Sequence, residues 1–262
     1  MILAIIQARM GSARLPGKIL KDILGQPLLG HLINRLSRVR TVDNIVVATT
    51  YAQADDPVEK MCLEKGCSCF RGSENDVLDR FYQAALSYGV RDGDAIVRIT
   101  GDCPLLDPEV VDNVIGLFVE SEADYASNVN PPTYPDGLDV EVFTFAVLKT
   151  AWNEASLLSE REHVTPFIRD NSQRFKQANL ENARDLSGLR WTVDVEEDFV
   201  FVRTVYEKLY SNNSVFTTEE VLGLLERNPE LLTINSKFKR NEGLLKSLHN
   251  DALFIRSGED DV

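Results

Sequence analysis

The chain has 262 residues, 44% of them hydrophobic, so it can bury a core without disulfides or a structural metal. Its 41 acidic and 28 basic residues give a net charge of −13, which argues against nucleic acid or an anionic membrane as the main partner. No apolar run reaches the roughly 18 residues of a membrane span, and the N-terminus lacks a leader pattern, so we expect a cytoplasmic protein with no membrane partner. The four cysteines lack the spacing of a zinc site.

Apolar runs and amphipathic stretches alternate along the first half of the chain. Strands are predicted over 2–6, 45–48 and 95–99, and helices over 28–39, 56–65, 75–88 and from Pro108 onward. Because strands and helices alternate, crossover connections should join parallel strands. The pattern therefore predicts an α/β fold, with a mostly parallel, Rossmann-like sheet flanked by helices.

The middle of the chain has a different pattern. Residues 125–135 are rich in Asn and Pro, and the apolar residues at 138, 140 and 142 then alternate with acidic ones, as in a half-exposed strand. We therefore expect a small β element inserted beside the sheet. Further on, capping-box spacing over 159–162 predicts a helix start, 190–194 a strand followed by two helices, and 257–262 a frayed end.

The loop after the first strand is basic in an otherwise acidic protein. It carries charged donors, a hydroxyl and two glycines: Arg9, Gly11, Ser12, Arg14, Gly17 and Lys18. Such donors suit phosphate oxygens, and glycines let backbone amides approach a ligand. At the carboxyl end of a strand in an open sheet this predicts an oligophosphate site, with a solvated basic loop as the alternative. The loop matches neither Walker A nor the dinucleotide fingerprint, which argues against P-loop hydrolysis and hydride transfer.

Two aspartates follow predicted strands. Asp102 lies in the segment 99–107 and Asp194 ends the segment 190–194. Carboxylates held at the edge of a sheet can bind Mg²⁺ against nucleotide phosphates, but a helix N-cap is an equally good interpretation of each. Asp198 is expected to stabilise a helix. No partner His for Cys103 is visible in the sequence, so a thiolate nucleophile is not expected.

The string Gln7-Ala-Arg-Met-Gly-Ser-Ala-Arg-Leu-Pro-Gly-Lys-Ile-Leu20 strongly resembles the opening motif of the acylneuraminate and KDO cytidylyltransferases, and Gly25–His31 resembles the segment that follows it. The resemblance implies a nucleotidyltransferase fold, CTP as substrate and a loop that grips the triphosphate. It assigns nucleotide binding to Ala8, Arg9, Gly11, Ser12, Arg14 and Lys18. It assigns catalysis to Arg9, Arg14, Lys18 and Asp102.

The same resemblance bears on the metal and on the base. Asp102 matches the Gly-Asp-x-Pro motif of the family and Asp194 the first aspartate of its Asp-x-x-Glu-Asp motif, which implies that both bind Mg²⁺. The segment 70–80 reads on its own as a turn and a capped helix with Asp79 and Arg80 exposed. It resembles the segment around the cytosine pocket in the branch that includes spore coat polysaccharide biosynthesis protein F, which implies that Arg71 lies near the base.

Two further segments, 134–141 and 161–166, resemble the same branch. Their polar residues would bind the acceptor: Asp136, Asp139 and Glu141 as acceptors of hydrogen bonds from sugar hydroxyls, and Arg161 and His163, with Arg169, as partners of a carboxylate. A structural histidine is an equally good interpretation of His163. Cys103 stands where the KDO enzymes have Glu, so KDO itself is not the expected acceptor.

The resemblance covers roughly residues 1–210 and implies a nucleotidyltransferase domain there, with an insertion at about 128–175 for acceptor binding and a dimer contact. Residues 211–262 are expected to form a helical extension and tail. The expected activity is transfer of CMP from CTP to an acidic sugar of the nonulosonic- or ulosonic-acid kind, with release of pyrophosphate, for surface polysaccharide biosynthesis by a homodimer. The alternatives are a sugar-1-phosphate nucleotidyltransferase that uses another nucleoside triphosphate, and a non-catalytic nucleotide-binding relative.

Overall fold

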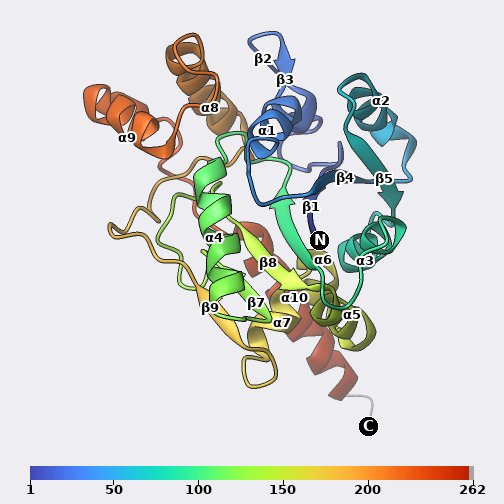
Figure 1. The fold of residues 1–262 in the computed structure, drawn as a ribbon. Coiled ribbons are helices and arrows are strands. Elements are labelled where there is room, and N and C mark those ends of the chain that lie inside the picture. The colour runs from blue at the N-terminus through green and yellow to red at the C-terminus, as the bar shows by residue number, and fades with distance from the viewer. Residues whose placement is uncertain (260–262) are drawn as a thin grey trace.

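The computed structural model describes the backbone of residues 1–259 and the side chains of residues 1–253. It forms an α/β fold around a seven-stranded sheet (Figure 1). The strand order is β5 (Ser68–Gly72), β4 (Asn44–Thr50), β1 (Ile2–Gln7), β6 (Ala95–Thr100), β8 (Glu141–Thr144), β7 (Tyr125–Ser127) and β9 (Gln177–Asn179). Only β8 runs antiparallel to its neighbours, which confirms the predicted mostly parallel sheet. In the described residues no helix is long and apolar enough to cross a membrane.

Helices cover both faces of the sheet. One face packs against α1 (Leu28–Leu36), α2 (Asp56–Glu64), α4 (Pro108–Glu120), α8 (Glu196–Leu209) and α9 (Thr218–Arg227), and the other against α3 (Val77–Ser87), α5 (Phe145–Glu154) and α7 (Pro166–Asp170). The central strand β1 shows why: Ala4 and Ile6 belong to the first cluster, Leu3 and Ile5 to the second. Because side chains alternate along a strand, a strand buried on both faces must be apolar throughout.

The remaining elements are short, apart from one C-terminal helix. A hairpin of β2 (Asp22–Ile23) and β3 (Gln26–Pro27) precedes α1, and single 3₁₀ turns lie at Lys18–Leu20, Gln53–Asp55 and Pro229–Thr233. The helix α6 (Leu158–His163) packs between α3 and α10 (Glu242–Glu259). The frayed end predicted from residue 257 therefore starts inside α10, and its last three residues lie outside the described residues.

The C-terminal extension shares the core of the preceding domain. Phe216 and Val221 belong to the same cluster as Val205 on α8. Arg35, on α1 and 2% exposed, donates hydrogen bonds of 2.5 Å from Nε to the carbonyl of Leu106 and from Nη2 to the carbonyl of Phe216. The extension as far as Leu231 thus belongs to the core beside the sheet.

Three local predictions need correction. The strand expected beside the sheet over 138–142 begins only at Glu141 and lies inside the sheet, with Glu141 itself buried. The segment 190–194 forms a single bridge, Arg190 to Asp136, instead of a strand. Ser159 does not cap α6: its side chain is buried, and Glu160 accepts instead, with Oε2 2.9 Å from the amides of residues 156 and 157.

From the strand order, a ligand-binding crevice is expected at the carboxyl end of β1. β4 and β6 lie on opposite sides of β1, so the loops after β1 and β6 diverge at this point of the carboxyl edge. The two loops nonetheless touch at their start, where the amide of Gly101 donates to the carbonyl of Gln7 at 2.8 Å. A Cβ at residue 101 would lie 2.8 Å from that oxygen and 2.9 Å from Cβ of Ala8, so only glycine fits.

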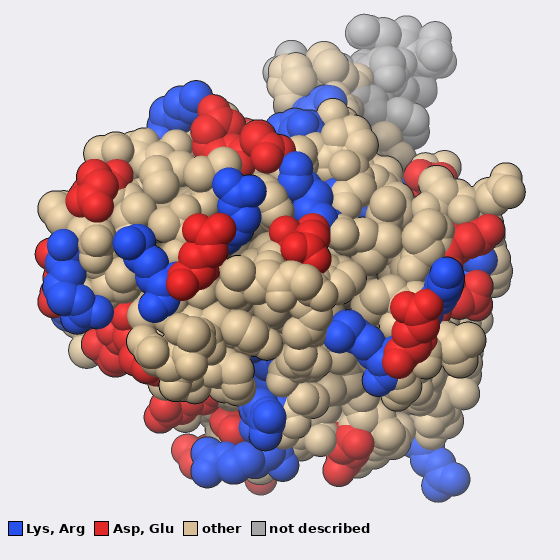
Figure 2. All heavy atoms as spheres, turned by 90° about the horizontal axis from the view of Figure 1, so that it is seen from above, with Lys and Arg blue, Asp and Glu red and all other residues tan. Residues whose placement is uncertain are grey.

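Acidic and basic side chains are interspersed on the surface. Figure 2 shows one face on which the Lys and Arg side chains of the described residues lie next to Asp and Glu side chains. Exposed pairs such as Lys237 with Glu197, 2.7 Å apart, are of this kind and contribute little to stability. A cation that has no carboxylate partner is therefore a better indication of a binding site than a paired one.

Candidate active site

Two cavities adjoin each other at the carboxyl ends of β1 and β6. The first has a volume of about 320 Å³ and the second about 240 Å³. They share six lining residues, Gln7, Arg14, Thr100, Asp102, His163 and Asp194. A molecule in one cavity can therefore touch a molecule in the other across these side chains.

The basic loop lines the first cavity with the six loop residues that were predicted to bind the nucleotide: Ala8, Arg9, Gly11, Ser12, Arg14 and Lys18. The loop is folded by its own polar groups. Ser12 Oγ accepts the amide of Leu15 at 3.3 Å, and Gly17 adopts a φ of 70° that favours glycine. The amide of Met10 donates to Asp55, a buried carboxylate that the sequence analysis did not identify, at 2.6 Å. The loop is thus held in place at both ends.

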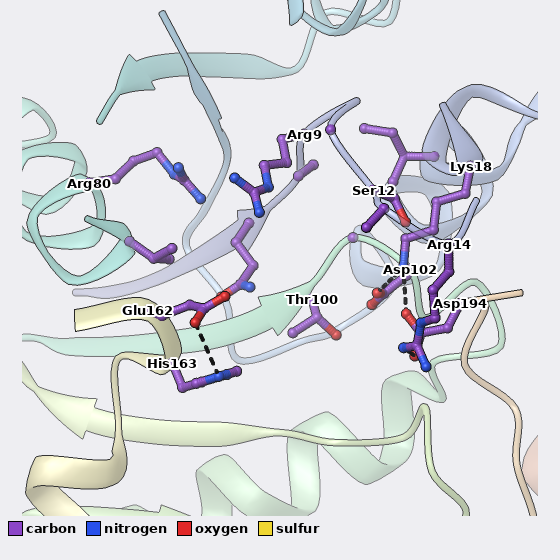
Figure 3. A pocket seen from close by; sticks show the side chains of 17 residues that line it. Arg9, Ser12, Arg14, Lys18, Arg80, Thr100, Asp102, Glu162, His163 and Asp194 are labelled. Atoms are coloured by element: carbon purple, nitrogen blue, oxygen red, sulfur yellow. Dashed lines mark hydrogen bonds and ion pairs between the residues drawn. The ribbon is translucent and has the colours of Figure 1, made fainter. Parts of the chain in front are cut away.

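Lys18 connects the two aspartates that were predicted as metal ligands. Its Nζ lies 2.6 Å from Asp102 Oδ2 and 2.8 Å from Asp194 Oδ1, and it also donates to the carbonyl of Val193 at 2.8 Å (Figure 3). Burial acts to lower the pKa of Lys18, but the two carboxylates outweigh it and raise the pKa. The lysine is therefore a fixed cation at the junction of the two cavities.

Asp194 is surrounded by further cations. Its Oδ2 lies 2.9 Å from both Arg14 Nη2 and Arg190 Nη2. Burial would raise the pKa of Asp194, but Lys18, Arg14 and Arg190 outweigh it and lower the pKa. Arg190 also pairs with Asp198 at 3.0 Å, and Asp198 Oδ2 accepts the amide of Val195 at the start of α8 at 3.2 Å. These contacts confirm the helix-stabilising role predicted for Asp198.

The two carboxylates fit a hard cation. Carboxylate oxygens are the donors that Mg²⁺ takes in proteins, usually one or two of them together with substrate phosphates. The ammonium group of Lys18 already lies between Asp102 and Asp194, which shows that this position favours positive charge. Within the described residues there is no group of three or more His, Cys, Asp or Glu side chains that could hold a metal, so phosphate oxygens would have to complete the coordination.

A third arginine of the first cavity, beside Arg9 and Arg14, was not predicted. Arg80 was expected on an exposed face, but its side chain is 2% exposed and points into the cavity beside Arg9 (Figure 3). Nη1 donates to the carbonyl of Ser73 at 2.5 Å, whereas Nε is buried without a partner among the described residues. Burial and the charge of Arg9 lower the pKa of Arg80 to about 10. Helical spacing from Val77 could have placed residue 80 on the buried face of α3.

Arg71, by contrast, does not line either cavity. Its guanidinium donates to the carbonyls of Thr50 and Ala52, both at 2.8 Å, and pairs with Asp56 at 2.7 Å and Glu59 at 3.0 Å. These contacts turn the side chain toward α2. The expected position of Arg71 near the base is therefore corrected: the arginine of this segment that reaches the first cavity is Arg80.

The predicted acceptor residues Asp136, Asp139, Glu141 and His163 line the second cavity. Each carboxylate is paired with an arginine: Asp136 with Arg190 at 2.9 Å, Asp139 with Arg240, and Glu141 with Arg98. Glu141 also accepts hydrogen bonds from the hydroxyls of Tyr125 at 2.6 Å and Thr165 at 2.7 Å. The floor of this cavity is a network of compensated charges.

Burial shifts the titration of this network. It raises the pKa of Asp136 to about 7, with the neighbouring charge of Asp139 as the second cause. Burial would also raise the pKa of Glu141, but Arg98 and Arg169 outweigh it and lower the pKa. For His163, burial lowers the pKa, so the imidazole is neutral at pH 7. Its Nε2 lies 3.1 Å from Ser247 Oγ.

Arg161 is not in the second cavity, which corrects the expectation for this residue. Its guanidinium pairs with Asp76 and donates to the carbonyl of Trp152 at 2.7 Å. Arg169 does line the cavity. In the part of the chain with described side chains, no carboxylate pairs with the Arg169 guanidinium and no hydrogen bond engages it. It is the counterpart of Arg80: each lines a cavity and has no carboxylate partner among the described side chains.

The C-terminal segment closes the second cavity, which the sequence analysis did not foresee. Residues 241–244 line it, and Arg240 donates to the carbonyl of Tyr134 at 3.0 Å as well as pairing with Asp139. Glu242 pairs with Arg14 at 2.6 Å. The sequence carried only one signal for this, a mixed-charge stretch over 237–242.

Comparisons with known proteins agree with this site. A family model described as cytidylyltransferase matches residues 3–228. The chain is 39% identical over 243 residues to a Methanocaldococcus jannaschii protein named uncharacterized protein MJ1063 (91% of this chain, 96% of the relative). It is 35% identical over 241 residues to the spore coat polysaccharide biosynthesis protein SpsF of Bacillus subtilis (88% of this chain, 97% of the relative). A solved cytidylyltransferase structure from Leptospira borgpetersenii superposes with a TM-score of 0.83 at 35% identity (88% of this chain, 96% of that chain).

Proposed function

Since this chain belongs to the cytidylyltransferase family and is a CTP-dependent nucleotidyltransferase, we propose that it transfers CMP from CTP to an acidic sugar, with Mg²⁺ as cofactor and pyrophosphate as the second product. The observation that carries the proposal is the cluster of Lys18, Asp102 and Asp194 at the junction of the two cavities. The junction is where a phosphate in one cavity would meet a hydroxyl in the other.

The first cavity suits the triphosphate. Arg9, Arg14 and Lys18 offer charge-assisted donors from one loop, and Arg80 lines the cavity with a guanidinium that has no carboxylate partner among the described residues. Nucleotidyl transfer needs little covalent chemistry from the protein, so positioning and neutralisation of charge supply the catalysis. Arg14 and Lys18 would steady the charge that develops on the departing pyrophosphate.

Asp102 and Asp194 would hold Mg²⁺. When bound, the cation supplies additional positive charge against the phosphate oxygens. Lys18 contacts both carboxylates and holds them at the junction. Its charge is also one of the causes that lower the pKa of Asp194. Asp198 and Arg190 fix the segment that carries Asp194.

The second cavity suits a sugar with one acidic group. Arg169 is its cation without a carboxylate partner among the described side chains, and the neutral imidazole of His163 lines the same cavity. Asp136 and Asp139 retain oxygen lone pairs that can accept hydrogen bonds from sugar hydroxyls. The name of the Bacillus subtilis relative supports a product destined for a surface polysaccharide. A homodimer, a cytoplasmic location and an acceptor insertion at 128–175 stay predictions.

The test is pyrophosphate release with each nucleoside triphosphate against a panel of sugars. We expect turnover with CTP and a sugar acid, loss of turnover with EDTA and recovery with Mg²⁺. The panel should include 3-deoxy-manno-octulosonate, N-acetylneuraminate and neutral sugars as controls. Preference for UTP or GTP with a sugar 1-phosphate would refute the proposal. Nucleotide binding without turnover of any sugar would favour a non-catalytic relative.

A further inference from the structure

Residues 240–251, the C-terminal segment, are tied to the site by contacts at four successive points. Arg240 pairs with Asp139, Glu242 Oε2 lies 2.6 Å from Arg14 Nη1, Ser247 Oγ donates to Glu162 Oε2 at 2.7 Å, and Asp251 Oδ1 accepts the amide of Ser159 at 3.2 Å. The family match ends at residue 228, so this segment lies beyond it. It is the wall of the second cavity that faces the basic loop.

Glu242 connects this wall to the nucleotide loop through its ion pair with Arg14. Arg14 lines both cavities, with its Nη2 on Asp194 and its Nη1 on Glu242. Both side chains of the Arg14–Glu242 pair are about two-fifths exposed, so the pair is accessible to a dissolved anion. Asp194 stays paired with Lys18 and Arg190 whether or not Arg14 leaves it.

A triphosphate and Glu242 compete for the same guanidinium. Phosphate oxygens bind arginine as strongly as a carboxylate does, and often with two parallel hydrogen bonds. A carboxylate left beside a bound triphosphate is repelled by it, more weakly as salt increases. When phosphate binds Arg14, the pair with Glu242 should therefore open.

We propose that Glu242 is a positioning residue that acts through Arg14: it holds the C-terminal wall over the second cavity when the first is empty, and it releases the wall when a triphosphate takes Arg14. The wall stays attached through Arg240 and Asp251, so only its middle moves. The acceptor cavity then widens after the nucleotide has bound. The inference rests on the proposed function only for the identity of the triphosphate as CTP.

The test measures binding of inorganic tripolyphosphate and of CTP by calorimetric titration. Glu242→Gln keeps a hydrogen-bond acceptor for Arg14 but removes the charge, so affinity for both ligands should rise about three- to tenfold. A purely structural role would lower the affinity or leave it unchanged. In the Arg14→Ala background the gain from Glu242→Gln should be clearly smaller, because only the direct repulsion between the carboxylate and the ligand then remains.

A matched control is Glu154→Gln. Glu154 pairs with Arg174 at 2.7 Å, with nearly the same exposure as the Arg14–Glu242 pair, and neither Glu154 nor Arg174 lines either cavity. This variant should leave both affinities unchanged. No gain in tripolyphosphate affinity for Glu242→Gln, or an equal gain without Arg14, would overturn the inference.

Hydrogen exchange gives a second readout on the unmodified protein. With tripolyphosphate bound, amides of residues 242–247 should exchange faster than in the free protein, whereas amides of β1 should not. Equal or slower exchange over 242–247 would overturn the inference. Both measurements use tripolyphosphate, so they decide it independently of the pyrophosphate-release assay, in which failure with CTP would refute only the proposed function.

Discussion

The two cavities differ in how their charges are balanced. In the first, Arg80 is buried without a carboxylate partner among the described residues, and the remaining cations come from one loop of the chain. In the second, the three carboxylates of the floor are each paired with an arginine that lies 43 to 101 residues away along the chain. The first cavity thus has Arg80 as a cation without a carboxylate partner, while its loop cations pair with carboxylates at 2.6 to 3.4 Å, several of them accessible to a ligand. The second cavity uses buried pairs to hold its own shape.

This difference indicates what each region is built to bind. Burial of a guanidinium without a carboxylate partner lowers the stability of the free protein. An anion that binds to the guanidinium offsets this loss. A compensated network instead presents fixed hydrogen-bond acceptors, which suits hydroxyl groups. Among the described side chains that line the second cavity, Arg169 departs from this pattern because no carboxylate pairs with it, and under the proposed function it would bind the acidic group of the acceptor.

The difference between the two cavities is tested most directly by removing one arginine from each. Arg98→Met leaves the carboxylate of Glu141 buried and lowers the free energy of unfolding by about 3 kcal/mol. Arg80→Met should change the free energy of unfolding by less than about 1 kcal/mol, because it removes a buried charge that has no carboxylate partner, while CTP affinity falls about 10- to 100-fold. Urea denaturation and calorimetric titration measure the two effects. Equal losses of stability would contradict the comparison.

At the junction, Asp102→Asn should lower kcat/KM for CTP about 100- to 1000-fold, because a neutral amide is a poorer ligand for a hard cation. The fold should persist, since Lys18 keeps its contacts with Asp194 and with the carbonyl of residue 193. Steady-state kinetics over a range of Mg²⁺ concentrations would measure the loss. Near-normal turnover in a folded Asp102→Asn protein would leave only a structural role for Asp102.

The network of the second cavity should show itself in the pH dependence of stability. Folding raises the pKa of Asp136 from 3.8 to about 7, so its protonated form favours the folded state. That stabilisation is complete below about pH 4 and is lost as the pH rises through 7. Between pH 5 and pH 8 the wild type should lose about 2 kcal/mol relative to Asp136→Asn. The free energy of unfolding of both proteins can be measured by urea denaturation at several pH values. Curves of this free energy against pH that run parallel for the wild type and Asp136→Asn would contradict the prediction.

The smallest effect is expected at Cys103, which lines the second cavity. Burial, with the charge of Asp102 as the second cause, raises the pKa of its thiol well above the usual range, so no thiolate is present at pH 7. Cys103→Ala should therefore leave kcat within about twofold of the wild type. A large loss in the pyrophosphate-release assay, at unchanged stability, would give the thiol a role that the structure does not suggest.

The site residues that could be predicted from the sequence are those that lie within one continuous segment of the chain. The basic loop, Asp102 and Asp194 were identified because each follows an apolar strand or an extended segment that reaches the sheet edge. Asp55, Arg80 and residues 241–244 were missed because only packing brings them to the site. The segment 70–80 shows the limit clearly: motif resemblance pointed to Arg71, whereas the burial of one face of α3 selects Arg80.

The contact at Gly101 also matters for attempts to alter the enzyme. It joins the ends of β1 and β6 so closely that the methyl group of an alanine at this position would force the two strand ends apart. The chain from 240 to 244 meets no such restriction, because residues 241–243 are exposed and rest on the site from outside. Substitutions in the C-terminal wall should therefore change which sugar is accepted more readily than substitutions at the ends of β1 and β6.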